Sequence, residues 1–351
     1  MTTSSSSSES AVAAQRGSAS IATHRWRELA ERMGMLLALA ALIVAFASVE
    51  PAFASLDNLF SVLQSVSIVA LLGIGVTITL AAGGFDLSVG SVAASAQMAA
   101  SYVLVVWHGS ALAAVAACLA LGIVVGLLNG LLTTRLRVPD QLATLGTLFL
   151  LAGLQLIPTG GRSLSTGAML PDGTSATGVF PGAFLALGRL RVFHDLVPLP
   201  VLILAVLALL AGATMETTRW GRVFYAIGGN EKAARLAGAA TQRYRIAAYV
   251  ASASIASLGG VLIAARVGRG DASAGHSLLL DAVAAALVGY AVWGARRPNV
   301  LGTVVGAIFV GVLLNGLTML NAPYYMQDFI KGALLVLSLA FTFGIAGRRE
   351  A

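Results

Sequence analysis

The sequence predicts an all-α polytopic membrane protein with about ten transmembrane helices and with both termini on the cytoplasmic side. Of its 351 residues, 58% are hydrophobic and only 11% are charged, whereas about 25% of the residues in an ordinary soluble domain are charged. Apolar runs long enough to cross about 30 Å of hydrocarbon as helices recur along nearly the whole chain. The basic residues gather in alternate connections between these runs, as the positive-inside rule expects.

Ten apolar segments reach the length that a membrane helix needs. They are residues 34–53, 59–81, 88–107, 111–133, 141–158, 196–215, 246–265, 279–294, 300–320 and 328–346. With a cytoplasmic N-terminus, 16 of the 22 Lys and Arg residues fall in cytoplasmic segments. A missed or extra helix would invert part of this pattern, so the charges support the count. The net charge of +7 is then a topology signal, because nucleic-acid binding would need basic residues clustered on one soluble face.

The ends of the chain are expected to be cytoplasmic tails that flank a transmembrane domain at 34–346. Residues 1–33 are basic, and their Ser- and Ala-rich start lacks apolar periodicity, which predicts disorder. Residues 347–351 form a short second tail. A signal peptide cleaved near "AFAS" at 52–55 is the alternative for the start, although the stretch before its apolar core is long for that role.

The stretch "GGFDLSVGS" at 83–91 interrupts two apolar segments and forms a helix-break motif. Its members are Gly83, Gly84, Asp86, Ser88, Gly90 and Ser91. The paired glycines permit a sharp turn, and Asp86 is expected to cap a helix that starts near Leu87. The small residues that follow let membrane helices approach closely. The alternative is a direct role for Asp86 in a substrate or ion path.

A second break lies near 294–303, where "GARRPNVLGT" joins two apolar segments with Pro298 and Asn299 in the turn. An "LLNG" element follows each break, at 127–130 and 313–316. This similarity suggests an internal repeat, a feature of many transporters.

The cytoplasmic segment 216–245 is the one long polar stretch on that side of the membrane. Asn230 can cap a short helix, Glu231 falls in its first turn and Gly238 can end it. An exposed, capped helix of this kind can dock in the groove of a partner protein. The alternative is an amphipathic connector that lies at the lipid surface.

Polar side chains within the apolar segments are candidates for a substrate path. The mid-segment amides are Gln64, Gln97, Asn129, Gln155 and Asn315, and the ring faces are those of Phe149, Tyr290 and Trp293. Hydrogen bonding between helices, or ordinary packing, is the alternative for each of them. Asp281 and Lys331 could line an outer vestibule, sit at the membrane interface or pair with each other.

No catalytic, cofactor or metal site is expected in this chain. The only lysines, Lys232 and Lys331, are followed by Ala and Gly, so the chain has no Walker A motif for ATP. The single Cys118 and four scattered histidines give no disulfide framework and no close metal-ligand pairing. Neither a nucleophile elbow nor an HExxH helix occurs.

Five stretches together resemble one transporter family. They are "GGFDLSVGS", "TLGTLFLLAGL" (144–154), "YAIGGNEKAARLAG" (225–238), "LDAVAAALVG" (280–289) and "VLGTVVGAIFVGVLLNGL" (300–317). In this order, over residues 55–345, the sequence is similar to the permease subunits of ribose-type sugar importers of the ABC class. The resemblance implies an ATPase-coupling role for Asn230, Glu231, Ala233, Ala234, Arg235 and Gly238.

The resemblance also implies the partners of the chain and its location in the cell. These are a second permease chain, identical or not, a periplasmic sugar-binding protein, and a separate ABC ATPase subunit that binds ATP-Mg. The implied location is the bacterial cytoplasmic (inner) membrane, in contact with its lipid, and the implied cargo is a ribose-like pentose, a hexose or a related polyol.

Two segments are where this chain could differ from the family. "YAVWGARRPN" at 290–299 replaces a serine-containing, glycine-rich run, so Arg296 and Arg297 either strengthen the cytoplasmic charge or adjust the ATPase contact. The periplasmic loop 159–195 could alter the preference for cargo or binding protein.

The alternative function is an ion-coupled secondary transporter of a small polar solute. Such a protein would normally need buried ionisable residues for ion coupling. The midsections of the expected helices are nearly free of them.

Overall fold

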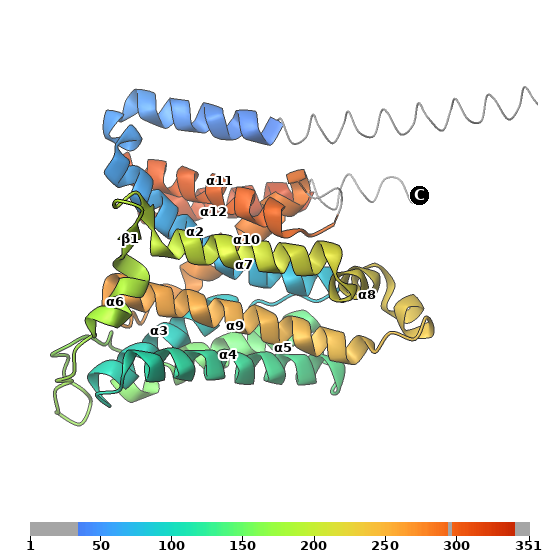
Figure 1. The fold of residues 1–351 in the computed structure, drawn as a ribbon, viewed down its shortest axis with the longest axis horizontal. Helices are drawn as coiled ribbons and strands as arrows, with labels where there is room; N and C mark the ends of the chain where they lie inside the picture. Colours follow the sequence, from blue (N-terminus) through green and yellow to red (C-terminus); the bar gives the residue numbers. More distant parts are fainter. Residues whose placement is uncertain (1–33, 294–296, 341–351) are drawn as a thin grey trace, which may run out of the picture.

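The structure is a computed structural model that describes residues 34–293 and 297–340. Within these ranges the chain is mostly helical, and the one β-ribbon pairs β1 (Arg191–Val192) antiparallel with β2 (Val197–Pro198). The helices run side by side as a bundle (Figure 1). The expected all-α membrane class is therefore confirmed.

The helices have the following bounds. Gly34–Val49 comes first, and 3-10 helices lie at Pro51–Ala54 and Ile157–Thr159. The remaining helices are α2 (Leu56–Ala81), α3 (Val89–Val105), α4 (Ala111–Thr134), α5 (Asp140–Leu154), α6 (Gly182–Arg189), α7 (Leu199–Thr217), α8 (Arg219–Leu236), α9 (Thr241–Val267), α10 (Ala274–Trp293), α11 (Val300–Met319) and α12 (Tyr324–Leu339).

Each of the ten expected segments coincides with a helix. Six of the described helices are long and apolar enough to cross a membrane, and three further apolar helices are shorter. This makes the chain a multi-pass membrane protein. The number of spans and the side on which the termini lie stay predictions. The expected tails at 1–33 and 347–351, and residues 294–296 of the second break, lie outside the described residues.

Two segments without a long apolar run contain more helix than expected. The loop 159–195 includes α6 and β1, and in the polar segment 216–245, where a short helix is expected between Asn230 and Gly238, α8 already begins at Arg219. Neither helix has the continuous apolar stretch by which membrane helices are found in a sequence.

The bundle has two ends, which we name by the helices that lie there (Figure 1). At the α8 end, α4 stops and α5 and α9 begin beside α8. At the α6 end, Gly188 of α6 touches the last turn of α9, and Gly178 touches the last turn of α3.

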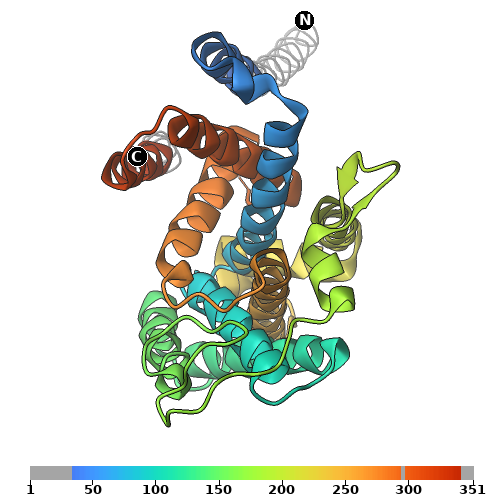
Figure 2. The same ribbon diagram turned by 90° about the vertical axis from the view of Figure 1, so that its left-hand side faces the viewer.

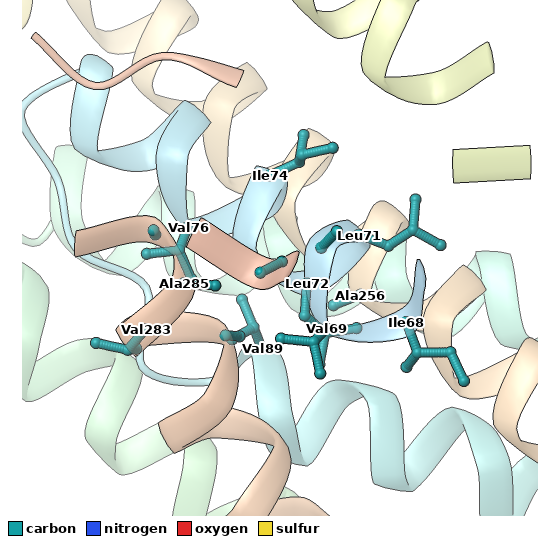
Figure 3. Close-up of a cluster of buried hydrophobic side chains, with 14 of the residues drawn as sticks. Ile68, Val69, Leu71, Leu72, Ile74, Val76, Val89, Ala256, Val283 and Ala285 are labelled. Atoms are coloured by element: carbon teal, nitrogen blue, oxygen red, sulfur yellow. The ribbon is translucent and has the colours of Figure 1, made fainter. Parts of the chain in front are cut away.

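α2 forms the centre of the bundle. All of its residues from 66 to 79 are buried, and Figure 2 shows it with α10, α11 and α12 on one side and α7 on the other. Its side chains pack against Val89 of α3, Ala256 of α9 and Ala285 of α10 (Figure 3). A helix that is apolar all round is stable only when it is enclosed in this way or by lipid.

α4 and α9 touch through their backbones. Gly122, Gly126 and Gly130 recur every four residues along α4 and so share one face. A Cβ atom added to them would lie 2.7 Å from Ala253 O, 2.5 Å from Val250 Cα and 2.9 Å from Ile246 Cα, respectively. Only glycine permits such an approach, which is how small residues bring membrane helices together.

Candidate functional site

α8 is divided by a kink at Asn230, whose backbone angles (φ −160°, ψ 98°) are not helical. Its side-chain Oδ1 accepts a hydrogen bond from Ala233 N–H at 3.0 Å, so Asn230 is the N-cap of a short helix at 231–236, here called the distal helix. Gly238, with φ +87°, follows its last turn and donates its N–H to Arg235 O at 3.0 Å. The expected cap and stop are therefore both present.

An ionic cluster fixes the distal helix to the bundle. Arg245 of α9 donates from Nη2 to both oxygens of Asp140, at 2.6 and 2.7 Å, and from Nη1 to Glu231 Oε2 at 3.0 Å. Tyr249, one turn further along α9, donates its hydroxyl to Asp140. Asp140, Glu231, Arg245 and Tyr249 form the Arg245 cluster. This pairing could not be predicted from the sequence, because Asp140 and Arg245 are 105 residues apart.

A cleft of about 990 Å³ opens beside the distal helix at the α8 end. It is lined by the end of α4, the first residue of α5, the distal helix and the start of α9. Its cationic residues, apart from Arg245, are Arg137, Lys232, Arg235 and Arg243. None of these four forms an ion pair within the part of the chain that the structure describes. The cleft therefore favours an acidic partner surface.

The distal helix also presents an apolar side chain to the outside. Leu236, its last residue, is 89% exposed. Ala233 is exposed as well, whereas Ala234 is buried and anchors the helix to the bundle. An exposed leucine flanked by unpaired cations is suited to contact with another protein.

The helix-break motif lies against α8. Gly83 adopts the left-handed conformation (φ +74°), as expected for a sharp turn after α2. A Cβ atom on Gly83 would lie 3.2 Å from Gly228 Cα, and one on Gly228 would lie 2.4 Å from Ala81 O. A Cβ on Gly84 would lie 2.6 Å from the Tyr249 hydroxyl. The break therefore contacts both α8 and the Arg245 cluster.

The expectation that Asp86 caps a helix starting near Leu87 is wrong. α3 begins at Val89 with Ser88 as its N-cap. Asp86 is fully buried, and its carboxylate accepts hydrogen bonds from Ser88 N–H at 2.9 Å, Ser88 Oγ at 2.6 Å and Ser252 Oγ at 2.8 Å. The chain runs inward beyond Gly84 before α3 starts, so the carboxylate meets hydroxyl groups of the interior instead of the first turn of a helix.

The hydrogen bonds of Asp86 continue across the bundle. Asn129 of α4 donates to Ser88 Oγ at 2.9 Å, and Thr147 of α5 donates to Asn129 Oδ1 at 2.6 Å. Ser252 is eleven residues into α9, about 16 Å from its start at a helical rise of about 1.5 Å per residue. We call Asp86, Ser88, Asn129, Thr147 and Ser252 the Asp86 network. It joins α3, α4, α5 and α9 well inside the bundle.

The remaining residues of the break pack closely, as expected. Ser91 Oγ donates to Ser88 O at 2.9 Å. A Cβ atom on Gly90 would lie 2.3 Å from Gly275 O at the start of α10. The small residues on this face of α3 therefore allow the backbone of α10 to approach closely.

The five amides considered for a substrate path do not form one cluster. Asn129 belongs to the Asp86 network, Asn315 exchanges hydrogen bonds of 2.9 and 3.0 Å with Asn58, and Gln97 donates to Arg269 O at 3.0 Å. Gln64 and Gln155 are half-buried, with no side-chain hydrogen bond inside the described ranges. Three of the five therefore join structural elements to one another.

The aromatic candidates are also dispersed. Phe149 is 67% exposed on α5, which places its ring on the outside of the chain. Tyr290 is half-buried in α10. The side chain of Trp293 lies outside the described part of the structure.

Asp281 and Lys331 pair with each other. Lys331 Nζ lies 2.9 Å from Asp281 Oδ1 and 3.8 Å from Asp328 Oδ1. Lys331 and Asp281 are only 9% and 13% exposed in their side chains. Each is seven residues into its helix, about 10 Å from the α6 end. Of the readings open for them, mutual pairing is the one that the structure shows.

The second break is attached to α8. Asn299 caps α11 by accepting from Gly302 N–H at 2.6 Å. Arg297 Nη2 lies 2.7 Å from Glu216 Oε2, and its guanidinium lies 4.8 Å from the centre of the Tyr225 ring. Tyr225 donates its hydroxyl to Pro298 O at 2.8 Å. Burial raises the pKa of Tyr225 to about 12, so this hydroxyl stays a donor at neutral pH.

Among residues 34–293 and 297–340, no group of three or more His, Cys, Asp or Glu side chains is placed to hold a metal ion.

Comparison with known proteins identifies relatives over most of the chain. A family model described as the permease component of branched-chain amino acid transport systems matches residues 58–339. The ribose import permease protein RbsC of Escherichia coli K12 is 34% identical over 305 residues, which cover 87% of this chain and 91% of the relative. No solved structure matches.

Two other relatives extend the range of named cargoes. The xylose transport system permease protein XylH of Haemophilus influenzae is 30% identical over 325 residues, covering 80% of this chain and 87% of the relative. The autoinducer 2 import system permease protein LsrC of Salmonella paratyphi B is 32% identical over 280 residues, covering 80% and 76%.

Proposed function

The chain belongs to the family of permease components of branched-chain amino acid transport systems, and on this premise we propose that it is the membrane-spanning permease subunit of an ATP-driven ABC importer. Its cargo is a monosaccharide, meaning a ribose-like pentose, a hexose or a related polyol, delivered by a periplasmic binding protein. The names of the relatives support this cargo class, since two of them carry ribose and xylose.

The observation that carries the proposal is the distal helix beside its cationic cleft. A capped helix with an exposed leucine, next to a cleft of about 990 Å³ with four unpaired cations among the described residues, supports docking of an ATPase subunit. In this role Asn230 and Gly238 set the ends of the helix and Ala233 and Arg235 face the ATPase. Glu231 and Ala234 hold the helix to the bundle.

The mechanism is alternating access. Two permease chains enclose the path, and two ATPase subunits that bind ATP-Mg dock at their α8 ends. This end faces the cytoplasm, and the chain lies in the cytoplasmic membrane of a bacterium. ATP binding and hydrolysis shift the pair between outward-open and inward-open states, because the partners bind the two states with different affinity. The permease itself changes no covalent bond.

The proposal is tested by reconstitution in liposomes with the candidate ATPase and binding protein of the same genome. Arg235→Glu/Leu236→Glu reverses one unpaired charge and removes the exposed leucine of the distal helix. Copurification of the ATPase and ATP-dependent uptake of sugar are both expected to fall at least about tenfold, as loss of interface anchors predicts. Arg162→Glu, a charge reversal of an exposed residue in the loop toward the α6 end, is the control for ATPase binding and should retain copurification.

An ion-coupled secondary transporter is the second candidate, and the buried Asp281–Lys331 pair is the observation that favours it. Buried ionisable residues serve as ion sites in such transporters. Here the carboxylate already holds an ammonium group, which disfavours a free ion site. Uptake driven by an imposed ion gradient in liposomes without any ATPase would overturn the importer proposal.

The cargo class has its own test. Acceleration of ATP hydrolysis by the loaded binding protein would be compared for ribose, xylose, glucose, a polyol and leucine. One of the sugars or the polyol is expected to accelerate hydrolysis. Acceleration by leucine alone would reassign the cargo to amino acids, the class in the description of the family.

A further inference from the structure

The distal helix is bounded by a break in the helical backbone on each side. It follows the non-helical residue Asn230 and precedes Gly238, which has a positive φ angle. A six-residue helix between two such points gains little stability from its own backbone. Its orientation relative to the membrane helices therefore depends on side-chain contacts.

Arg245 supplies the main polar contact of this kind. Its guanidinium holds Glu231, the first residue of the distal helix, and both carboxylate oxygens of Asp140, the first residue of α5. The Arg245 side chain is only 13% exposed. A planar guanidinium can bind two carboxylates at once in fixed directions, which the ammonium group of lysine cannot do as rigidly.

The contacts of the Arg245 cluster lead into the bundle. Tyr249 joins the cluster through Asp140 and lies under Gly84 of the helix break. Two residues beyond Gly84 is Asp86, whose network spans α3, α4, α5 and α9. A displacement of the distal helix is thus passed to the starts of α5 and α9 and to the break.

Arg243 provides the contrast. It lies two residues before Arg245 and lines the same cleft, but it is exposed and forms no ion pair within the described residues. The two arginines therefore carry the same charge and lie close together, but among the described residues only Arg245 is held by carboxylates.

We propose that Arg245 is the positioning residue that transmits motion of the distal helix to the membrane-spanning helices, through its simultaneous hold on Glu231 and Asp140. This inference rests on the proposed function, in which the ATPase moves the distal helix. The exposed face of the distal helix then binds the ATPase, and the ion pair of Glu231 with Arg245 transmits the motion.

The first test measures coupling in the full complex of permease, ATPase and binding protein. Glu231→Gln removes the negative charge that the distal helix offers to Arg245 and leaves Arg245 bound to Asp140, so the fold is expected to be retained. ATPase binding and basal hydrolysis are expected to persist, whereas acceleration by the loaded binding protein and uptake fall at least about tenfold. Arg245→Gln should show the same loss, and Arg245→Lys should restore part of the coupling.

The second test needs no ATPase and so separates this inference from the proposed function. Amide hydrogen exchange of residues 231–238 is measured in the purified full chain. Exchange is expected to be at least about tenfold faster in Glu231→Gln and Arg245→Gln than in wild type and Arg243→Gln. In the first two variants the distal helix can open without breaking an ion pair, which lowers the free energy of local opening.

Two outcomes would overturn the inference. Unchanged exchange in both variants would show that Arg245 does not hold the distal helix. Loss of ATPase binding in Glu231→Gln, with hydrogen exchange unchanged, would show that Glu231 is a contact residue and not part of a transmission path. Failure of the wild-type chain to bind any ATPase would instead overturn the proposed function, while the exchange result would still decide whether Arg245 holds the helix.

Discussion

The ion pair between Asp281 and Lys331 ties α10 to α12, and its removal tests whether these two helices depend on it. The two charged atoms are 2.9 Å apart. At an effective dielectric constant of about 20, unit charges at that separation attract by about 6 kcal/mol, before the cost of removing them from water is subtracted. Breaking a buried pair by removing one partner typically costs about 3–5 kcal/mol, because the remaining charge is left buried.

The two single variants are expected to differ. Lys331→Met leaves the Asp281 carboxylate without its cation and should cost about 3–5 kcal/mol. Asp281→Asn should cost less, because Asp328, 3.8 Å from Lys331, still offers a carboxylate. The double variant Asp281→Asn/Lys331→Met removes both charges and should cost about 2–3 kcal/mol less than the sum of the single variants.

Reversible unfolding in SDS mixed micelles, followed by circular dichroism, would measure the free energy of unfolding of each variant. Arg269→Gln is the matched control, since it removes the ion pair with Asp271 at 3.2 Å, in which Arg269 is 53% exposed. An exposed pair of this kind is worth less than about 1 kcal/mol. The reasoning would be refuted if Lys331→Met cost no more than Arg269→Gln, or if the two single variants were additive.

Three further variants test other contacts. Gly228→Ala would place a Cβ atom 2.4 Å from a carbonyl oxygen of α2 and should destabilise the chain by about 1–3 kcal/mol in the same titration. A Cβ atom on Gly229 meets no described atom within 4 Å, so Gly229→Ala should not destabilise the chain. Equal destabilisation by the two variants would contradict the close approach of α8 and α2. Arg297→Gln removes an exposed ion pair and a contact with an aromatic ring, so a thermal scan should show a loss under about 1 kcal/mol, and a loss above about 2 kcal/mol would mean that the turn depends on it. Asn129→Leu leaves two buried hydroxyl groups without their amide partner and should cost about 1–3 kcal/mol, whereas a neutral effect in SDS unfolding would contradict the Asp86 network.

The membrane helices and the distal helix could be predicted from the sequence because their causes are local. A run of about 20 apolar residues has few stable states other than a helix in lipid or in a protein core. The cap at Asn230 and the stop at Gly238 depend on backbone groups within four residues of each. The structure therefore agrees with the prediction where the deciding contacts lie close along the chain.

The connections between the helices could not be predicted in the same way. Arg245 and Asp140 both appeared as ordinary charges near the ends of apolar segments, and their partnership depends on how α5 and α9 pack. Asp86 was misread for a related reason. Its sequence neighbours suit an N-cap, but Ser252, 166 residues away, supplies the hydroxyl that makes a buried position favourable. The first half of α8 was missed because it has no long apolar run, although the Thr218 side chain caps its start.

The backbone contact between α4 and α9 limits how this protein can change shape. Where two helices meet through side chains, rotamer changes can absorb a relative shift of the backbones. At Gly122, Gly126 and Gly130 no side chain is present to do so, and the approach is already too close for even one added carbon atom. α4 and α9 are therefore expected to move together and not to slide past each other. If Arg245 transmits motion as proposed, a rotation of α9 near Arg245 would carry α4 with it toward the α6 end, about 30 Å away at a helical rise of about 1.5 Å per residue.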